Sequence, residues 1–370
     1  MHIARTLSLY IARVFSFTMM MWLFGLTALL TLGDVIELLR RSATKPDATF
    51  GVVIEIAALR VPWLAMQIIP FAVLGGGIMA FWRLTRSSEL VVARAAGVSV
   101  WQILVGPVLC AIALGTFATA AVSPISAVMR ARSEALDNVY LKTGGGPLAL
   151  AGGQLWMRQS DRAIDPEGVA ILHAGGVQLQ GADLTTQGLS VFRLDHGDRL
   201  LERIEAASGV LAAGNWVLDD ARTVTAGHIP DAPRRILLPT NMTVDRVEES
   251  FAAPDTFSVW ALPGFIELLE RSGFSAIRHR LQFQSLLALP LLAGTMALLA
   301  AGFSMRPTRQ GGVGRMIGSG FSAGFALFAV SKVTEEFGQS GALPALLAAW
   351  APAASGLMLS VALLLHQEDG

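Results

Sequence analysis

Long runs of uncharged, mostly apolar residues alternate with short charged stretches along this chain of 370 residues. A helix that crosses the hydrocarbon core of a bilayer needs about 20 consecutive apolar residues. Six runs reach or approach this length, three before a long polar region and three after it: 14–33, 61–82, 95–129, 281–305, 316–331 and 337–365. The pattern predicts an α-helical membrane protein with six transmembrane helices in a 3+3 arrangement.

The polar region between the third and fourth runs has a different periodicity. Apolar and polar positions alternate there, as at Thr185–Leu194 and Trp216–Val224, and Gly, Asp and Asn separate the short segments. Alternation with a period of two is typical of strands, and regularly spaced strands favour a sandwich or barrel. Six strands are expected: 152–159, 168–176, 184–195, 199–211, 215–220 and 234–244. We therefore predict a β-sandwich or jelly-roll domain inserted between helices 3 and 4, which could bind a ligand or dock another β protein by a strand edge.

On this pattern the chain has three parts. Residues 1–123 hold the first three transmembrane helices, residues 124–256 hold the β domain, and residues 257–370 hold the last three helices. The third part begins with Phe257–Arg271, whose apolar positions recur at helical spacing. An amphipathic helix at the membrane interface is expected there, with Trp260 at the level of the headgroups.

Arginine in the short loops sets the predicted orientation. The loops after the second and fourth runs are rich in arginine: Arg83, Arg86, Arg94, Arg306, Arg309 and Arg315. Six spans put both loops on one side of the membrane, and short basic loops stay in the cytoplasm, so the β domain faces the other side. The loop on that outer side also carries positive charges that need another explanation: Arg40, Arg41, Lys45 and Arg60.

Composition agrees with a membrane protein and argues against several classes of function. The chain is 53% apolar and 15% charged, with a mean hydropathy of +0.55, which is too apolar for a typical soluble domain. The formal net charge is zero, so no surface for nucleic acid is predicted. The single cysteine, Cys110, and the spacing of the six histidines indicate neither a disulfide nor a metal site.

No signature of nucleotide binding is present either. The chain has no Gly-Lys pair, so it lacks the phosphate-binding loop in which that lysine reaches the phosphates of ATP. No cofactor is predicted. If ATP drives this protein, a partner must hydrolyse it.

The stretch Arg83–Trp101, between the second and third runs, is too polar for lipid and predicts a short helix. Ser87 can cap its start, Glu89 falls in the first turn where the helix dipole favours an anion, and Gly97 can end it. A helix of about ten residues is marginal alone in water, so something must pack on it. Two interpretations stay open: a handle that a cytosolic partner grips, or an ordinary loop between spans.

Four arginines beyond the first and third runs are candidates for a lipid-phosphate site: Arg40, Arg41, Arg130 and Arg132. Asp34 and Glu37 precede the first two of them. If the first helix continues outward, Glu37 and Arg41 are four residues apart and can pair. The planar fork of arginine donates two parallel hydrogen bonds to a phosphate. The simpler alternative is that these arginines only extend from solvated helix ends to headgroups.

A serine in the fifth run matches the pattern of a catalytic nucleophile. The sequence Gly320-Phe-Ser322-Ala-Gly324 resembles the nucleophile elbow, but that motif needs a strand, a sharp turn and a helix. Inside an apolar run we interpret these glycines, with Gly314 and Gly318, as a packing face. No catalytic residue is predicted.

Charges near the end of the fifth run have two explanations. Lys332 can pair with Glu335 or Glu336, three and four residues further along a helix. Charges at membrane depth are costly and face a cavity or a partner. Alternatively, the fifth span ends at about Val330 and these residues lie in water.

Several short motifs together resemble the lipopolysaccharide export permeases, the LptF/LptG (YjgP/YjgQ-like) family, and within it most closely the LptG branch. The motifs are Tyr-Ile-Ala-Arg-Val-Phe at 10–15, Arg-Ser-Ser-Glu-Leu-Val-Val-Ala-Arg-Ala-Ala-Gly at 86–97, Arg-His-Arg-Leu at 278–281, and Leu-Pro at 343–344 with Ala-Pro at 351–352. The stretch at 86–97 is the most specific. The resemblance covers essentially the whole chain.

The resemblance implies a permease subunit of an ATP-driven exporter in the bacterial inner membrane, with a periplasmic jelly roll. Such a subunit draws lipopolysaccharide from the outer leaflet into a V-shaped cavity, which we expect spans one and five to line. The implied partners are an LptF-like sister permease, an LptB-like ATPase dimer, an LptC-like single-span protein beside the first span, and a periplasmic β-jellyroll bridge protein. The subunit itself would not be an enzyme.

The resemblance also suggests roles for two groups of residues. The helix at 87–97 would lie in a groove of the ATPase, with Glu89 as the matching acid; its coupling residues would be Ser88, Glu89, Leu90, Arg94 and Gly97. Contacts to lipid phosphate would come from Arg40, Arg41, Arg130 and Arg132. Asp34 stands at a position that is lysine in well-known relatives, so that contact is expected to differ here.

A function from another class fits the same pattern. A mechanical transmitter would pass ATP-driven motion to a periplasmic partner without moving a lipid. A third possibility is an intramembrane hydrolase built on Ser322. A lipid-filled cavity would favour transport over both.

Overall fold

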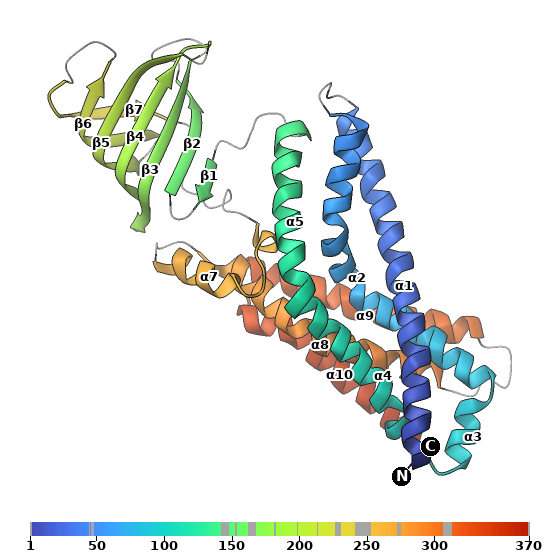
Figure 1. The fold of residues 1–370 in the computed structure, drawn as a ribbon. Coiled ribbons are helices and arrows are strands. Elements are labelled where there is room, and N and C mark those ends of the chain that lie inside the picture. The colour runs from blue at the N-terminus through green and yellow to red at the C-terminus, as the bar shows by residue number, and fades with distance from the viewer. Residues whose placement is uncertain are drawn as a thin grey trace. The chain divides into compact units, whose positions relative to one another are not determined.

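The computed structural model describes residues 2–43, 45, 48–141, 148–151, 154–161, 168–180, 183–197, 199–212, 214–225, 231–240, 253–271, 275–305 and 313–368. The chain divides into two compact units (Figure 1). The membrane unit comprises Met1–Leu141, Pro254–Pro263 and Ile277–Gly370, and the β unit comprises Lys142–Ala253 and Gly264–Ala276. Arg306 and Arg309, which contribute to the predicted orientation, lie outside the described residues.

The six predicted transmembrane helices are confirmed. Six helical segments are long and apolar enough to cross a membrane: Thr6–Ser42, Phe50–Arg86, Val100–Leu141, Ile277–Ser304, Ile317–Gln339 and Ala345–His366. The helices of this unit are α1 (His2–Ser42), α2 (Phe50–Arg86), α3 (Glu89–Ala95), α4 (Val100–Phe117), α5 (Ser123–Leu136), α8 (Ile277–Ser304), α9 (Val313–Gln339) and α10 (Ala345–Glu368). Two π-helical segments, Ala118–Val122 and Asp137–Leu141, follow α4 and α5, so the third span continues to Leu141.

The first helices extend well beyond the hydrocarbon core. Helix α1 has 41 residues, which at 1.5 Å per residue is about 60 Å, twice the thickness of the core. The ends of α1 and α5 and the start of α2 therefore carry charged residues where a membrane would present headgroups or water. This explains how a helix that is apolar through Leu32 can also hold Asp34, Glu37 and two arginines.

Three consecutive glycines bring α1 and α2 into close contact. A Cβ atom on Gly76 would lie 2.5 Å from the Met19 Cα, and one on Gly75 would lie 2.6 Å from the Trp22 ring. The buried Thr18 hydroxyl donates a hydrogen bond of 3.0 Å to the Gly76 carbonyl oxygen. Small residues at such a contact let two membrane helices approach backbone to backbone.

The glycines around Ser322 are only partly a packing face. A Cβ on Gly320 would lie 2.9 Å from the Ile78 Cδ1, and one on Gly324 would collide with the Leu74 side chain, so both pack on α2. A Cβ on Gly314 or Gly318 would meet nothing within 4 Å in the described part of the chain, so these two glycines take no part in the contact with α2. Ser322 itself lies inside the continuous helix α9, without the turn that a nucleophile elbow requires.

The helix of the fifth run does not end at Val330, and whether its charged end lies in the membrane or in water stays a prediction. Helix α9 continues through the charged residues to Gln339, and the Lys332 ammonium lies 2.7 Å from the Glu335 carboxylate. The predicted pairing within the helix is thus confirmed for Glu335. It does not extend to Glu336 among the described residues.

The β unit is one antiparallel sheet of seven strands in the order of the chain, β1 to β7. The strands are β1 (Leu148–Ala151), β2 (Gln154–Ser160), β3 (Val169–Gln180), β4 (Asp183–Leu194), β5 (Leu200–Ala212), β6 (Asn215–Val224) and β7 (Arg234–Pro239). The six predicted strands correspond to β2–β7, and β1 was not predicted. A β domain inserted between helices 3 and 4 is confirmed, and the sheet's order is the detail that the sequence had left open.

Alternating side chains of the strands build the core of the β unit. Trp216 and Leu218 on β6 and Ile204 on β5 are at most 2% exposed. Helix α7 (Leu262–Arg271) covers this core with Leu269, while Phe265 also packs against it. The predicted amphipathic helix is present, but its apolar side is buried on the sheet. Its place at the membrane interface stays a prediction.

One charged cluster stabilises the sheet. The Arg193 guanidinium on β4 pairs with the carboxylates of Asp161 and Glu202. Burial alone would lower the pKa of Arg193, but the hydrogen bonds that it donates to these two carboxylates raise its pKa above the ordinary value. Paired in this way, the arginine stays charged although its side chain is only 14% exposed.

Candidate functional site

Helix α3, between α2 and α4, has seven residues, fewer than the ten or so expected. Leu90 and Ala93 are only 4% and 6% exposed and anchor it to the membrane unit. Val91 and Val92, by contrast, are 55% and 67% exposed. A short helix with one buried and one exposed apolar side is suited to contact something further, since exposed valines gain by burial.

The start of α3 differs from the prediction. Ser87 does not cap the helix: it follows the last residue of α2. Its hydroxyl lies 2.7 Å from the Glu89 carboxylate and 3.1 Å from the Arg83 carbonyl oxygen, either of which can accept its single hydrogen. Ser88 precedes the first turn and has a φ of 61°. Such a left-handed conformation is costly for a residue other than glycine, so the turn between α2 and α3 is fixed by its surroundings.

The end of α3 agrees with the prediction. Gly97 has a φ of 83°, and its N–H donates to the Arg94 carbonyl oxygen at 3.0 Å. Glycine adopts this conformation without a steric cost, so it ends the helix cleanly. The exposed Arg94 side chain lies in the last turn, where a cation is favoured by the helix dipole.

At the other end of α1 the two adjacent arginines have different surroundings. The Arg40 guanidinium pairs with Glu37 on its own helix at 2.9 Å and is 77% exposed. Arg41 lies 3.1 Å from Asp137 and is 34% exposed. The expected pair of Glu37 with Arg41 is therefore wrong, because a buried carboxylate from another helix competes for Arg41.

Asp34, Arg60 and Asp137 form a buried network with Arg41. The Arg60 guanidinium donates to Asp34 at 3.0 Å and lies 3.6 Å from Asp137. It also donates to the Ser133 hydroxyl at 3.0 Å. Arg60 is 12% exposed and Asp137 7%. These contacts join the ends of α1, α2 and α5 and explain why the outer loop needs the positive charge of Arg60.

The arginines beyond the third span also have carboxylate partners. Arg130 pairs with Asp255 at 3.0 Å, lies over the Trp63 ring at 4.5 Å, and is 16% exposed. Arg132 pairs with Glu55 at 3.0 Å and is 68% exposed. Arg130 is thus held inside the unit, whereas Arg132 remains accessible.

The predicted phosphate residues are therefore not one continuous cluster. Within the described residues, each of the four arginines forms an ion pair with a carboxylate, and Arg41 is the one that joins the Arg60 network. Sequence analysis had missed the part played by Arg60 and Asp137. They lie 77 positions apart in the chain, so no local pattern links them.

Other kinds of site are not found in the described part of the chain. No group of three or more His, Cys, Asp or Glu side chains could hold a metal ion there. Cys110 is a free cysteine of intermediate exposure.

Comparisons with known proteins agree with one another. A family model described as "Lipopolysaccharide export system permease LptF/LptG" matches residues 9–366. The chain is 24% identical over 375 residues to the lipopolysaccharide export system permease protein LptG of Escherichia coli strain K12, with 97% of each chain covered. It is 22% identical over 357 residues to the protein of the same name from Haemophilus influenzae, with 95% of each chain covered.

Proposed function

This chain belongs to the LptF/LptG family of lipopolysaccharide export permeases, and from that premise we propose that it moves lipopolysaccharide with energy from a partner ATPase. It is a multi-pass membrane protein and a permease of the export system. We propose that it takes lipopolysaccharide from the outer leaflet of the inner membrane and passes it to a periplasmic bridge protein. The family match over residues 9–366 is the observation that carries this proposal.

ATP-driven motion would enter the membrane unit through α3. Its buried side, with Leu90 and Ala93, holds it to the spans, while Arg94 and the two valines are exposed to a partner. Glu89 is half-buried and accepts a hydrogen bond from Ser87, which a donor of the partner would replace. A partner groove that buries Val91 and Val92 and offers a donor to Glu89 would grip this helix. Ser88 and Gly97 would fix its orientation, because each adopts a left-handed conformation at one end. A displacement of α3 by the partner would then move α2 and α4, which precede and follow it in the chain.

Lipid phosphate would meet the exposed arginines first. Arg40 and Arg132 are 77% and 68% exposed, and each is paired with one exposed carboxylate that a phosphate could replace at little cost. Arg41 would contribute from the edge of the buried network. Arg130, with its carboxylate and tryptophan partners, would contribute mainly by positioning the end of α5.

Spans one and five would form the part of the cavity wall that moves to admit lipid. Only 11% of the apolar window of α1 and 17% of that of α9 is buried within the chain, against 67% for α8. The Trp22 ring on α1 lies 5.7 Å from the Phe321 ring on α9, so these two helices meet there. Exposed apolar sides on α1 and α9 would face acyl chains or neighbouring subunits.

The proposed partners follow from the same premise. They are an LptF-like sister permease, an LptB-like ATPase dimer, an LptC-like single-span protein beside α1, and a periplasmic β-jellyroll protein. The last would extend the sheet of the β unit at an edge, and in the described sheet the edge strands are β1 and β7. The chain would contribute no catalytic residue of its own.

Affinity purification of the tagged chain from its native membranes, with mass analysis of proteins and lipids, tests this proposal. We expect an ATPase, a second six-span protein and a glycolipid bearing lipid A. An ATPase without any lipid would favour the mechanical transmitter instead. Purification of the chain alone would contradict the proposal.

A further inference from the structure

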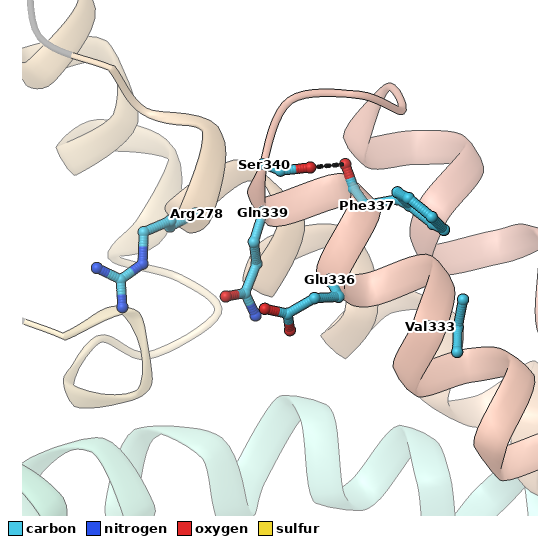
Figure 2. Close-up of a pocket in the computed structure, with 6 residues that line it drawn as sticks. All are labelled: Arg278, Val333, Glu336, Phe337, Gln339 and Ser340. Atoms are coloured by element: carbon cyan, nitrogen blue, oxygen red, sulfur yellow. Dashed lines mark hydrogen bonds between the residues drawn. The ribbon is translucent and has the colours of Figure 1, made fainter.

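The start of α8 and the end of α9 frame a pocket of about 540 Å³ that the proposed function does not use (Figure 2). The pocket is lined by Arg278, Val333, Glu336, Phe337, Gln339 and Ser340. Its volume lies within the range of about 300–1,000 Å³ that is typical of ligand sites. Because one span begins at Ile277 and the other ends at Gln339, the pocket lies where a bilayer presents its headgroups.

Opposite charges line this pocket without neutralising each other. Arg278 and Glu336 are both exposed, and neither forms an ion pair or side-chain hydrogen bond with another residue in the described part of the chain. The neighbouring Glu335, by contrast, pairs with Lys332 at 2.7 Å. Figure 2 shows the Glu336 and Gln339 side chains extending from α9 into the space on the side of Arg278. A ligand that carries both an anion and a cation fits this arrangement.

The acceptors around Glu336 suit an ammonium group. The Ser340 hydroxyl donates its hydrogen to the Phe337 carbonyl oxygen at 3.0 Å, which leaves its oxygen available as an acceptor. The Gln339 amide supplies a further acceptor oxygen. A primary ammonium has three hydrogens to donate, and Glu336, Gln339 and Ser340 can each accept one. Arg278 supplies the two parallel donors that suit a phosphate.

Close packing holds the wall of the pocket in place. A Cβ on Gly338 would lie 2.7 Å from the Ala348 Cβ, so α9 and α10 are in direct contact behind the lining residues. The Leu343 N–H donates to the Phe337 carbonyl oxygen at 3.1 Å and closes the turn after α9. Gly341 has a φ of 77°, which this turn requires. A preformed wall lowers the entropy lost on binding.

We propose that this pocket binds the headgroup of a bilayer phospholipid that carries a phosphate and a primary ammonium, that is, a phosphoethanolamine headgroup. Arg278 binds the phosphate, and Glu336 with Gln339 and Ser340 binds the ammonium. Val333 and Phe337, which are 55% and 51% exposed, contact the acyl chains. The site goes beyond the proposed function, because its ligand is a lipid of the surrounding bilayer rather than the exported glycolipid.

Lipid competition measured by native mass spectrometry tests this site. The full chain, with whatever subunits co-purify, is incubated in detergent with equal amounts of phosphatidylethanolamine, phosphatidylcholine and phosphatidylglycerol that have identical acyl chains. We expect phosphatidylethanolamine to be retained about tenfold over phosphatidylcholine, because a quaternary ammonium cannot donate hydrogen bonds to the Glu336 carboxylate. Phosphatidylglycerol should be retained least, because it brings no cation to that carboxylate.

Matched variants separate the pocket from the general charge of the helix end. Glu336→Gln should remove the preference for phosphatidylethanolamine, and Arg278→Gln should lower the retention of all three lipids because each carries the phosphate. Glu335→Gln, one position away from Glu336, should keep both the preference and the retention. Both pocket side chains are exposed, so the variants should fold, and an unchanged elution profile on size exclusion checks this. Equal retention of all three lipids, stronger retention of phosphatidylglycerol, or an equal loss in Glu335→Gln would overturn the proposal. None of these outcomes bears on lipopolysaccharide export.

Discussion

The two ends of the membrane unit differ in whether their charged side chains form ion pairs within the chain. At the end formed by α1, α2 and α5, arginines and carboxylates from different helices pair with each other, and Arg60 and Asp137 are nearly buried. At the α3 end, Arg94 has no ion-pair partner among the described residues, and two valines are exposed beside it. The first end is completed within the chain. The second leaves Arg94 and the two valines exposed, as our proposal of a partner at this end requires.

This difference separates stability from association. A buried network stabilises a fold only while all of its members are present, since the loss of one leaves another charge buried and unpaired. The exposed side of α3, unlike the buried Leu90 and Ala93, contributes little to the fold. Substitutions at the first end should therefore lower stability, whereas those at the second should mainly weaken a partner's binding. The predictions below follow from this division, from the largest effect to the smallest.

Removal of Arg60 should have the largest effect. Arg60→Ala leaves Asp34 and Asp137 without their shared partner, so we expect a loss of about 3–5 kcal/mol in the free energy of unfolding. Thermal unfolding of the purified chain in detergent measures it. Arg132→Ala is the matched control, because it removes an exposed pair worth about 1 kcal/mol or less. Equal shifts in melting temperature for the two variants would show that the network is not a stabilising element.

Loss of the α3 carboxylate should weaken association rather than the fold. Glu89→Ala removes a charge-assisted hydrogen bond to the partner, worth about 1.5–3 kcal/mol, so the ATPase should bind roughly 10- to 100-fold more weakly. Binding of the purified ATPase to the chain in nanodiscs measures this. Glu335→Ala, an acid on α9, serves as the control. Unchanged ATPase binding by Glu89→Ala would mean that α3 is an ordinary loop between spans.

The adjacent arginines of α1 allow a finer comparison. Arg40→Glu should lower the crosslinking of lipopolysaccharide to this helix end about fivefold, as expected for an exposed contact of about 1 kcal/mol, and leave the melting temperature unchanged. Arg41→Glu should lower both, because the new carboxylate faces Asp137. If Arg40→Glu leaves crosslinking at the wild-type level, this arginine contacts only the headgroups of the surrounding bilayer.

Ser322 should matter least. Ser322→Ala changes an exposed side chain within a helix, so the free energy of unfolding should change by no more than about 0.5 kcal/mol. Export of lipopolysaccharide in cells carrying the variant should equal that of the wild type. A selective loss of a hydrolytic activity would revive the hypothesis of an intramembrane hydrolase.

The sequence predicted the elements whose signals are local. Six apolar runs gave six spans, alternation gave β2–β7, and Gly97 marked the end of α3 because a single residue decides that conformation. The short strand β1 was missed, since four residues, Leu148–Ala151, offer too little alternation to detect. Helix α7 was predicted, but its contact was not, because an apolar side can face a membrane or a sheet.

The ion pairs were the least predictable part of the candidate site. Asp34 and Arg60 are 26 positions apart, and Arg41 and Asp137 are 96 apart. Spacing along one helix favoured Glu37 with Arg41. The structure shows that α5 packs on α2 and that the π-helical segment Asp137–Leu141 contacts α1, so the buried carboxylate of Asp137 takes that arginine. The signal that was available was an unexplained excess of positive charge in the outer loop. Arg60 accounts for part of this excess, because it pairs with Asp34 and Asp137.

Site-specific photo-crosslinking at position 40, with and without ATP, tests the central claim most directly. The assembled complex in native membranes carries a photoreactive residue in place of Arg40, and crosslinked lipopolysaccharide is detected by antibody. The account predicts a crosslink without ATP that decreases when ATP is added, and no such decrease in a second complex that also carries Glu89→Ala. A crosslink that ATP does not change, or none at all, would contradict the claim that one end of this unit holds the lipid while the other receives the energy.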